Sequence, residues 1–238
     1  MNANDIIVLI PYYTNELTQF ERYSLEKALK TFSKYPISFV SPEGFTVCDE
    51  YQNVPVQRFD KKYFNGLRGY NQLLLSDLFY KRFLDHTYIL IYQLDALVFK
   101  DELEYWCSLN YDYYGAPWNK GWKRSYFNFY GLLTTSVGNG GFCLRKTEVF
   151  YKMTRKIKMI AKYILFGEDI FWCTYGRLLN PSLKIIDRKL AVRFAFESQP
   201  ADLFSQNGNE LPFGCHAFEK NDLPFWRRII YDLPAASI

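Results

Sequence analysis

A carboxylate in the middle of the most apolar stretch of the chain is the first side chain that could do chemistry. Asp95 follows an apolar run of strand-forming residues that begins at Tyr88, and apolar residues continue to Phe99. An ionised aspartate in an apolar layer is costly unless it is protonated, paired or bound to a cation. Ligands of open α/β sheets collect at the carboxyl ends of strands, where a strand that ends near Leu94 would place Asp95. The alternative is a strand-end aspartate that caps local amides.

Two other polar groups could act in acid–base or metal chemistry. Glu168 and Asp169 open a predicted helix, where carboxylates favour the helix dipole, and an aspartate fixed in this way is also a ready general base. His216, one of only two histidines, follows a Gly-Cys turn. It is either a metal ligand or a partly buried histidine whose hydrogen bonds are satisfied.

A cluster of glycines precedes a short apolar segment. Gly138, Gly140 and Gly141 surround Asn139, and the strand-like sequence FCLR follows. Glycine permits positive φ and a close approach of the backbone to a ligand, whereas the alternative is a plain turn into an antiparallel strand.

Two more segments are candidates for nucleotide contacts. The loop Pro11-Tyr12-Tyr13 follows the first predicted strand, so either tyrosine could contact a base or simply pack at the surface. Arg68 and Asn71 fall near the start of a predicted helix, where an arginine could meet a phosphate or remain solvated.

The elements that must position these residues follow an α/β pattern. The first forty residues read strand, helix, strand, which is a βαβ unit with a right-handed crossover. We therefore expect one α/β domain with a mostly parallel sheet, helices on both faces and a small antiparallel addition after Gly138. The expected strands are 6–11, 37–40, 54–59, a central one within 88–99, 142–145, 183–186 and 190–194; the expected helices are 67–83, 102–106, 148–166 and one opening at 168; and 118–130 is expected to be a loop that covers a site.

Composition narrows the class of protein. The chain has 238 residues, of which 49% are hydrophobic and 19% aromatic, which excludes general disorder. A net charge of +4 is too mild for a nucleic-acid partner. Five scattered cysteines without a Cys-x-x-Cys pair indicate a reduced cytoplasmic protein with no structural zinc, and neither a membrane span nor a signal segment is evident.

The expected helix 148–166 is strongly basic. One interpretation is a helix that contacts an anionic membrane surface at the periphery, and the other is a solvated basic face. Its basic residues are Lys152, Arg155, Lys156, Lys158 and Lys162.

Four of these motifs together resemble the GT-A class of nucleotide-sugar glycosyltransferases. They are Gln93-Leu94-Asp95 after a central strand, the glycine loop 138–142, Glu168-Asp169 at a helix start, and the late His216. More closely, the segments YQLDALVF, DYYGAPW, VGNGGFCLRK and GCHAFEK look like a bacterial glycosyltransferase-like domain family of poorly defined activity. The resemblance covers roughly Ile6 to Lys220 and implies a single three-layer GT-A-like domain over residues 1–238.

The resemblance also implies roles. Asp95 and His216 would hold Mn²⁺ or Mg²⁺ against the donor diphosphate, with Pro11–Tyr13 at the nucleotide. Asp169 would be the base of an inverting displacement, while Asn139, Gly140, Gly141 and Glu168 face the donor sugar or acceptor. One departure is Gln93 at the first acidic position of the metal motif, because a neutral amide is a poorer ligand for a hard cation. Gln93 would instead bind ribose or a phosphate-bound water.

The predicted activity is transfer of a sugar from a nucleotide diphosphosugar to a hydroxyl of a glycan or lipid-linked glycan, in cell-surface polysaccharide synthesis. Gln93 keeps open a non-catalytic nucleotide- or carbohydrate-binding module. A nucleotidyltransferase is a further alternative, although PYYTNELTQ lacks the glycine-rich basic loop usual for that class after the first strand.

Overall fold

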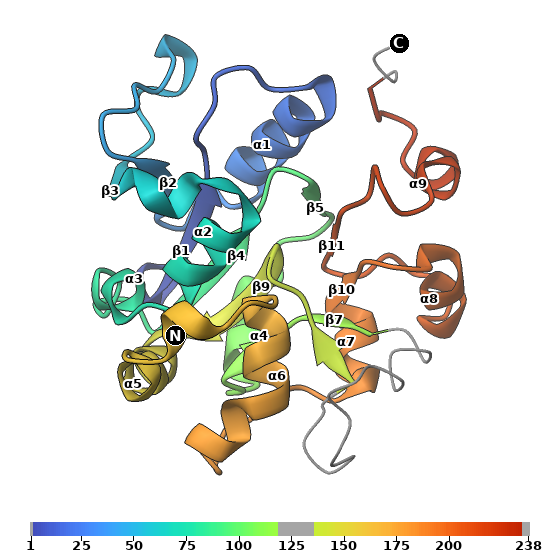
Figure 1. Cartoon of the computed structure of the whole chain (residues 1–238). Coiled ribbons are helices and arrows are strands. Elements are labelled where there is room, and N and C mark those ends of the chain that lie inside the picture. The colour runs from blue at the N-terminus through green and yellow to red at the C-terminus, as the bar shows by residue number, and fades with distance from the viewer. Residues whose placement is uncertain (1, 119–135, 235–238) are drawn as a thin grey trace.

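The computed structural model describes residues 2–118 and 136–234, and its centre is a six-stranded sheet in the order β3-β2-β1-β4-β9-β6 (Figure 1). Strands β3, β2, β1 and β4 run parallel, β9 is antiparallel to β4, and β6 is antiparallel to β9. This confirms the predicted mainly parallel α/β sheet with an antiparallel addition. The strands are β1 (Ile6–Pro11), β2 (Ile37–Pro42), β3 (Val56–Phe59), β4 (Tyr88–Tyr92), β6 (Tyr113–Tyr114) and β9 (Phe142–Lys146).

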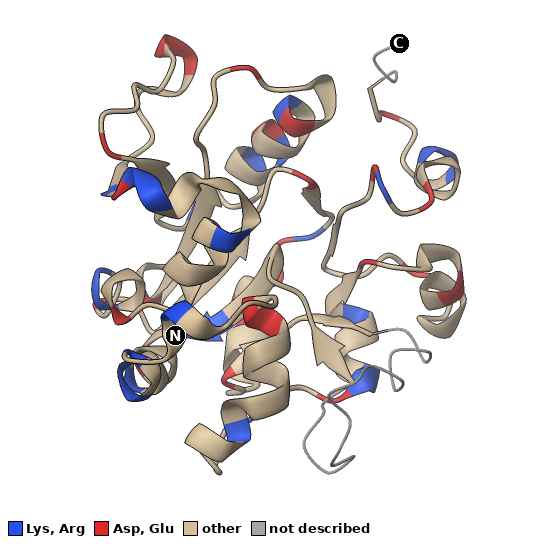
Figure 2. Ribbon diagram, viewed as in Figure 1, with Lys and Arg blue, Asp and Glu red and all other residues tan. Residues whose placement is uncertain are grey.

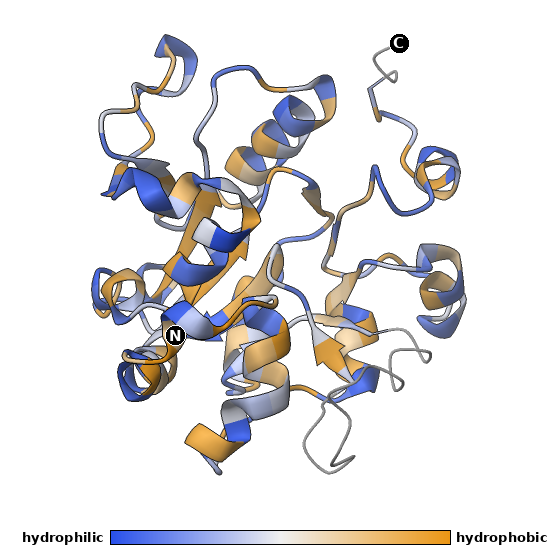
Figure 3. Cartoon of the chain, viewed as in Figure 1, coloured by the Kyte–Doolittle hydropathy of each residue, from blue (hydrophilic) through white to orange (hydrophobic). Residues whose placement is uncertain are grey.

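The two central strands explain why the site lies at one edge of the sheet. Every residue of β1 and β4 is buried, and Figure 3 shows these strands as hydrophobic, as strands covered on both faces must be. Ile6 pairs with Tyr88 and Leu9 with Ile91 in parallel register. The segments that follow β1 and β4 therefore meet at the same edge of the sheet.

Helices cover both faces of this sheet. On one face, Phe32 after α1 makes a ring contact with Tyr92 of β4, and Tyr92 contacts Phe142 of β9. On the other, Tyr80 of α3 contacts Phe150 of α5 and hydrogen-bonds Arg145, three residues along β9 from Phe142 and so on the opposite face. The helices are α1 (Gln19–Thr31), α2 (Gly66–Leu74), α3 (Asp77–Lys81), α4 (Leu103–Ser108), α5 (Thr147–Ile157), α6 (Glu168–Leu179), α7 (Arg188–Phe194), α8 (Pro200–Gln206) and α9 (Leu223–Ile229).

The apolar run 88–99 forms two strands rather than one. β4 ends at Tyr92, a turn carries Gln93 to Asp95, and β5 (Ala96–Val98) joins a second sheet in the order β10-β11-β5. The antiparallel pairing of β5 with β11 (Gly214–His216) sets His216 opposite Ala96. A small sheet thus places the late histidine beside Asp95. The remaining strands are β7 (Ala116–Pro117), β8 (Val137–Gly138) and β10 (Ala195–Phe196).

The structure corrects two predicted helices. The expected helix 67–83 divides into α2 and α3, because the Ser76 hydroxyl accepts a hydrogen bond from the Phe79 amide and starts a new helix. The expected helix 148–166 ends at Ile157 and is followed by a 3₁₀ helix, Ala161–Tyr163. Short 3₁₀ helices also occur at Ala3–Asp5, Asp49–Tyr51 and Lys61–Phe64.

Two predicted late strands are also wrong. The segment 190–194 belongs to α7, which Asp187 caps by accepting a hydrogen bond from the Leu190 amide. Within 183–186 the structure has only an isolated bridge between Ile185 and Tyr113. The expected loop 118–130 lies outside the described residues except for Trp118. No helix in the described part of the chain is long and apolar enough to cross a membrane.

Candidate active site

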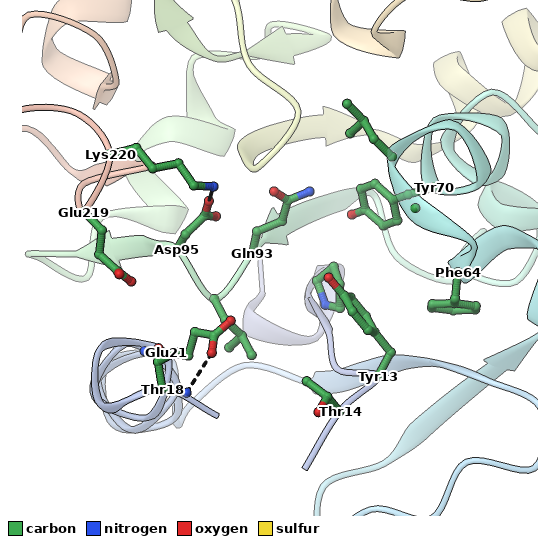
Figure 4. A pocket seen from close by; sticks show the side chains of 14 residues that line it. Tyr13, Thr14, Thr18, Glu21, Phe64, Tyr70, Gln93, Asp95, Glu219 and Lys220 are labelled. Atoms are coloured by element: carbon green, nitrogen blue, oxygen red, sulfur yellow. Dashed lines mark hydrogen bonds and ion pairs between the residues drawn. The ribbon is translucent and has the colours of Figure 1, made fainter. Parts of the chain in front are cut away.

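A cavity of about 510 Å³ opens at the edge of the sheet beyond β1 and β4 (Figure 4). Pro11 and Tyr13 after β1, Gln93 and Asp95 after β4, and Lys220 after β11 line it. Tyr70 of α2 lies against Gln93 and closes another side. This volume is within the usual range for a small-molecule site.

Asp95 lies between two cationic partners. Its Oδ1 is 3.1 Å from Nε2 of His216, and its Oδ2 accepts a hydrogen bond from Nζ of Lys220 at 3.1 Å. Burial alone would raise the pKa of Asp95, but the hydrogen bonds and charges of His216 and Lys220 outweigh it and hold the pKa well below its usual value. Asp95 is therefore the paired carboxylate that an apolar strand end requires.

His216 connects Asp95 to a second carboxylate that the sequence did not single out. Its Nδ1 is 3.0 Å from Oε1 of Glu197, and its Nε2 is also 3.2 Å from Oε1 of Gln93. Burial favours the neutral imidazole, but the hydrogen bonds and charges of Asp95 and Glu197 raise its pKa to about 9. We call Asp95, Glu197, His216 and Lys220 the acid–histidine cluster.

The acid–histidine cluster has donor atoms that suit a divalent cation. Adjacent ligands of an octahedral ion with bonds near 2.1 Å lie about 3.0 Å apart, close to the separations of His216 Nε2 from Asp95 Oδ1 and from Gln93 Oε1. Glu197 on Nδ1 would orient the imidazole, as carboxylates commonly do behind a metal-binding histidine. Within residues 2–118 and 136–234, no three His, Cys, Asp or Glu side chains gather as a metal site, so the third protein ligand would be the Gln93 amide.

The glycine loop after β8 allows this cluster to form. A Cβ on Gly141 would lie 2.0 Å from Nε2 of His216 and 2.7 Å from Oε1 of Gln93, distances that side-chain atoms do not tolerate. The Gly141 carbonyl also accepts a hydrogen bond from the main-chain N–H of Gln93 at 2.7 Å. Gly140 has the same role toward the other side of the loop, because its Cβ would lie 2.8 Å from Oε1 of Glu168.

Asn139 fixes the shape of this loop. It is 1% exposed and has a φ of 145°, a conformation that usually favours glycine. Its Oδ1 accepts hydrogen bonds from the amides of Gly141 and Phe142, and its carbonyl accepts one from Tyr113. Nδ2 of Asn139 is buried with no hydrogen-bond partner in the structure as described. A strained residue with an unused donor is typical of a functional loop.

Glu168 is held by Arg145, which was not among the predicted site residues. Arg145 of β9 donates two hydrogen bonds to the Glu168 carboxylate, at 2.7 and 2.9 Å, and both side chains are almost fully buried. Burial raises the pKa of Glu168, and Arg145 opposes that rise. Arg145 also donates to the hydroxyl of Tyr80. We call Arg145 and Glu168 the arginine–glutamate pair.

Asp169 follows Glu168 in the first turn of α6. Burial raises its pKa, the Ile170 amide counteracts this, and the negative charge of Glu197 raises it further. The charge of Glu197, a member of the acid–histidine cluster, therefore influences the pKa of Asp169. Asp169 does not line the cavity itself, but a carboxylate with a raised pKa is suited to accept a proton.

The other residues predicted to bind the donor nucleotide do not all lie at the cavity. Tyr13 is 55% exposed and lines the cavity, but Tyr12 is buried, stacks on Phe39 and does not line it. Arg68 is exposed on α2 and is not part of the cavity wall. Asn71 instead accepts a hydrogen bond from the Glu168 amide at 3.4 Å. Of the residues predicted to bind the donor nucleotide, Pro11, Tyr13, Gln93 and Asp95 therefore line the cavity.

Comparison with known proteins places this chain in a family. The family model described as "Protein of unknown function (DUF5672)" matches residues 53–216, more than half of the chain, so the chain belongs to that family. Comparison with curated protein sequences gives no match.

Solved structures identify the fold as that of the GT-A glycosyltransferases. The galactosyltransferase LgtC, in complex with donor and acceptor sugar analogues, matches with a TM-score of 0.55 and 13% identity over 89% of this chain and 86% of its own. Core-mannan synthase A from Aspergillus fumigatus, in a Mn/GDP form, matches with a TM-score of 0.55 and 9% identity over 78% and 73%. A glycosyltransferase involved in glycosylation of the major capsid of PBCV-1 matches with a TM-score of 0.51 and 12% identity over 89% and 91%.

Proposed function

We propose that this protein transfers a sugar from a nucleotide diphosphosugar to a hydroxyl of a glycan or lipid-linked glycan in cell-surface polysaccharide synthesis. The observation that carries the proposal is that the side chains of Asp95, His216 and Gln93 converge at the cavity edge. The likeness to glycosyltransferases with bound donor analogues or Mn/GDP supports it at the level of the fold.

The cavity offers separate contacts to the parts of a donor. The exposed ring of Tyr13 can stack on a base, and Gln93 and Thr14 line the wall where a ribose would lie. The Lys220 side chain is 75% exposed, and within residues 2–118 and 136–234 its ammonium contacts the Asp95 carboxylate, so it can exchange that carboxylate for a phosphate oxygen. Gln93 in place of an acid and Lys220 beside it reduce the negative charge that a diphosphate would meet.

Asp95, the neutral form of His216 and the side-chain amide of Gln93 are the groups that would hold Mn²⁺ or Mg²⁺, and binding would displace the proton that Asp95 and Glu197 favour on His216. A bound divalent cation supplies Lewis-acid stabilisation of the charge that develops on a departing diphosphate. Glu197 keeps Nδ1 of His216 occupied, so that Nε2 faces the cavity side. The protein's own contribution is to fix these donors at a preformed distance, which the glycine at position 141 permits.

In the proposed reaction, the oxygen of the acceptor hydroxyl forms a bond to the anomeric carbon of the sugar, and Asp169 accepts the proton of that hydroxyl. The bond from that carbon to the diphosphate oxygen breaks, and the electron pair leaves with the nucleotide diphosphate. Asn139 and Gly140 would face the sugar, with the unused Nδ2 of Asn139 as a donor. Attack from the face opposite the leaving group inverts the anomeric centre, so a retained product would exclude Asp169 as this base.

Donor binding and product release test the proposal together. Titration with uridine and guanosine diphosphosugars, with and without Mn²⁺, should show saturable binding to one of them, strengthened by the metal. Release of free nucleotide diphosphate in the presence of an acceptor separates a transferase from a binding module. Binding to no donor would contradict the proposal.

Two variants assign the roles. Asp169→Asn should lower turnover by about 10²–10⁴-fold and leave donor binding nearly unchanged. Asp95→Ala should lose both, because it removes a metal ligand and the partner of His216 and Lys220. Asp202→Ala, an exposed carboxylate on α8, is the matched control and should change neither.

A further inference from the structure

The turn between α5 and α6 exposes apolar side chains that a stable surface would normally bury. After α5 ends at Ile157, the chain tightens into the 3₁₀ helix Ala161–Tyr163. Met159 is 86% exposed, Ile160 53%, Tyr163 69% and Leu165 73%. We call residues 158–165 the apolar turn.

Basic residues surround the apolar turn. Positions 149–167 contain five Lys or Arg residues and neither Asp nor Glu, and Figure 2 shows basic residues on α5. Two of them reach carboxylates outside the segment: Lys152 contacts Glu148 at 2.7 Å and Lys158 contacts Asp77 at 3.2 Å. Arg155 and Lys162 lie instead over the rings of Tyr151 and Tyr163, so their charge remains available to an external anion.

A shallow hollow on α5 adds a place for an anionic group. It has a volume of about 590 Å³ and is lined by Lys152, Arg155 and Lys156 together with Val149, Met153 and Asn180. Lys156 donates to the Leu179 carbonyl at 2.5 Å, which fixes its ammonium at the rim. The hollow has room for a phosphate-bearing headgroup and is continuous in sequence with the apolar turn.

We propose that the apolar turn and the basic hollow form a docking surface for an anionic lipid bilayer. Exposed apolar groups of different sizes projecting from one turn suit insertion into a fluid interface, and adjacent basic groups attract anionic headgroups. Positive charge without intervening acids is complementary to such a surface. A protein partner would need an apolar hollow or a flat face here, whereas three of the six residues that line the nearby hollow are basic.

The position of the surface connects it to the proposed function, on which this step rests. The apolar turn leads directly into α6, which begins with Glu168 and Asp169 (Figure 1). The Glu168 amide hydrogen-bonds Asn71 of α2. Docking would therefore bring the acceptor side of the proposed site close to the bilayer, which favours a lipid-linked acceptor.

Vesicle sedimentation tests the surface without donor or acceptor. The intact chain should bind phosphatidylcholine vesicles that contain phosphatidylserine and should bind pure phosphatidylcholine far more weakly. Removing two charges with Arg155→Gln and Lys162→Gln should weaken binding about 25-fold, since each basic residue near an anionic surface contributes about fivefold. Lys30→Gln with Lys189→Gln, two exposed lysines elsewhere, is the matched control and should change it little.

The apolar contribution has its own pair of variants. Ile160→Ser with Tyr163→Ser should abolish most binding at high salt, where a Debye length shortened to about 3 Å at 1 M leaves insertion as the main attraction. Leu84→Ser with Tyr231→Ser removes exposed apolar groups elsewhere and should have no effect. The proposal would be overturned if the intact chain bound neither vesicle type or bound both equally. It would also be overturned if each control pair lost as much binding as its test pair. Failure of sugar transfer would not, because this assay involves no transfer.

Discussion

Two ionic clusters lie on opposite sides of the glycine loop and differ in their access to the cavity. The acid–histidine cluster adjoins the cavity: Asp95 lines it, and the side chains of Asp95, Glu197 and Lys220 are 23%, 28% and 75% exposed. The arginine–glutamate pair is sealed, with side chains 0% and 2% exposed and two hydrogen bonds between them. The loop residues Gly140 and Gly141 each leave space for one of them.

The comparison separates a cluster that can exchange partners from one that cannot. Partners of an exposed ion pair are readily replaced by a ligand, because water already competes for them. A buried pair that loses one member leaves an uncompensated charge in a low-dielectric interior. In the proposed function the open cluster is therefore the one expected to bind substrate and cation. The sealed pair holds the start of α6, and hence Asp169, against β9.

The largest effect is expected from breaking the sealed pair. Arg145→Met should lower the free energy of unfolding by about 3–5 kcal/mol, because Glu168 is then buried without a counter-charge. The pKa of Glu168 is raised in the folded protein, so the folded chain keeps the Glu168 proton over a pH range in which the unfolded chain releases it. The free energy of unfolding should therefore fall as the pH rises through that range. Chemical denaturation at two pH values measures both effects.

A double variant distinguishes charge from packing at the same place. Arg145→Met with Glu168→Leu removes both charges and should recover most of the lost stability. If the pair serves only to position α6, this variant should also retain donor binding. Stability that stays low in the double variant would show that packing, not the unpaired charge, causes the loss.

Alanine substitutions of the neighbouring residues Gly141 and Gly140 should affect different properties, the first metal binding and the second stability. Gly141→Ala places a methyl group 2.0 Å from Nε2 of His216, so it should displace the imidazole and weaken Mn²⁺ binding by at least about tenfold. Gly140→Ala meets the Glu168 carboxylate at 2.8 Å and should mainly lower the melting temperature. Metal titration and thermal unfolding of both variants check this, and identical profiles would remove the distinction between the two sides of the loop.

The charge of Glu197 should contribute to metal affinity in the acid–histidine cluster. Glu197→Gln keeps a hydrogen-bond acceptor for Nδ1 of His216 but removes the charge. Carboxylates behind a metal-binding histidine typically contribute about 10–100-fold in affinity, so Mn²⁺ binding should weaken within that range with little change in stability. Unchanged Mn²⁺ affinity would mean that Glu197 only packs against the histidine.

The central sheet could be predicted from the sequence because its strands are continuous apolar runs. Ile6–Pro11 and Tyr88–Tyr92 are buried on both faces, which leaves a strong signal in composition. Leu190–Phe194 was misassigned because its apolar residues do not reveal that Asp187 caps a helix. The break at Ser76 was missed for the same reason: one capping hydroxyl outweighs a continuous helical periodicity.

The site was only partly predictable, for a different reason. Asp95, Gln93 and His216 lie together, yet Glu197, the partner of His216, and Arg145, the partner of Glu168, were not among the predicted site residues. Arg145 could have been found from its place directly after the apolar residues Phe142, Cys143 and Leu144 of a predicted strand, because a buried cation requires a buried anion. Glu197 offers no such signal, because its role depends on the pairing of β10 with β11.

The smallest effect, and the most specific one, is expected in the pH dependence of turnover. The groups that influence Asp169 are the Ile170 amide, Arg145 and Glu197, and burial together with Glu197 raises its pKa above the ordinary carboxyl value. A base acts only when deprotonated, so turnover should fall as the pH decreases through this raised pKa.

Removing the Glu197 charge should move that acidic limb to lower pH, since less repulsion favours the ionised form of Asp169. Turnover measured at saturating donor, acceptor and Mn²⁺ in Glu197→Gln and in the unmodified protein tests the shift separately from any loss of metal affinity. The exposed carboxylate variant Asp202→Asn should leave the limb in place. A limb that does not move would mean that Asp169 and the acid–histidine cluster act independently, and the two sides of the glycine loop would then share no electrostatic coupling.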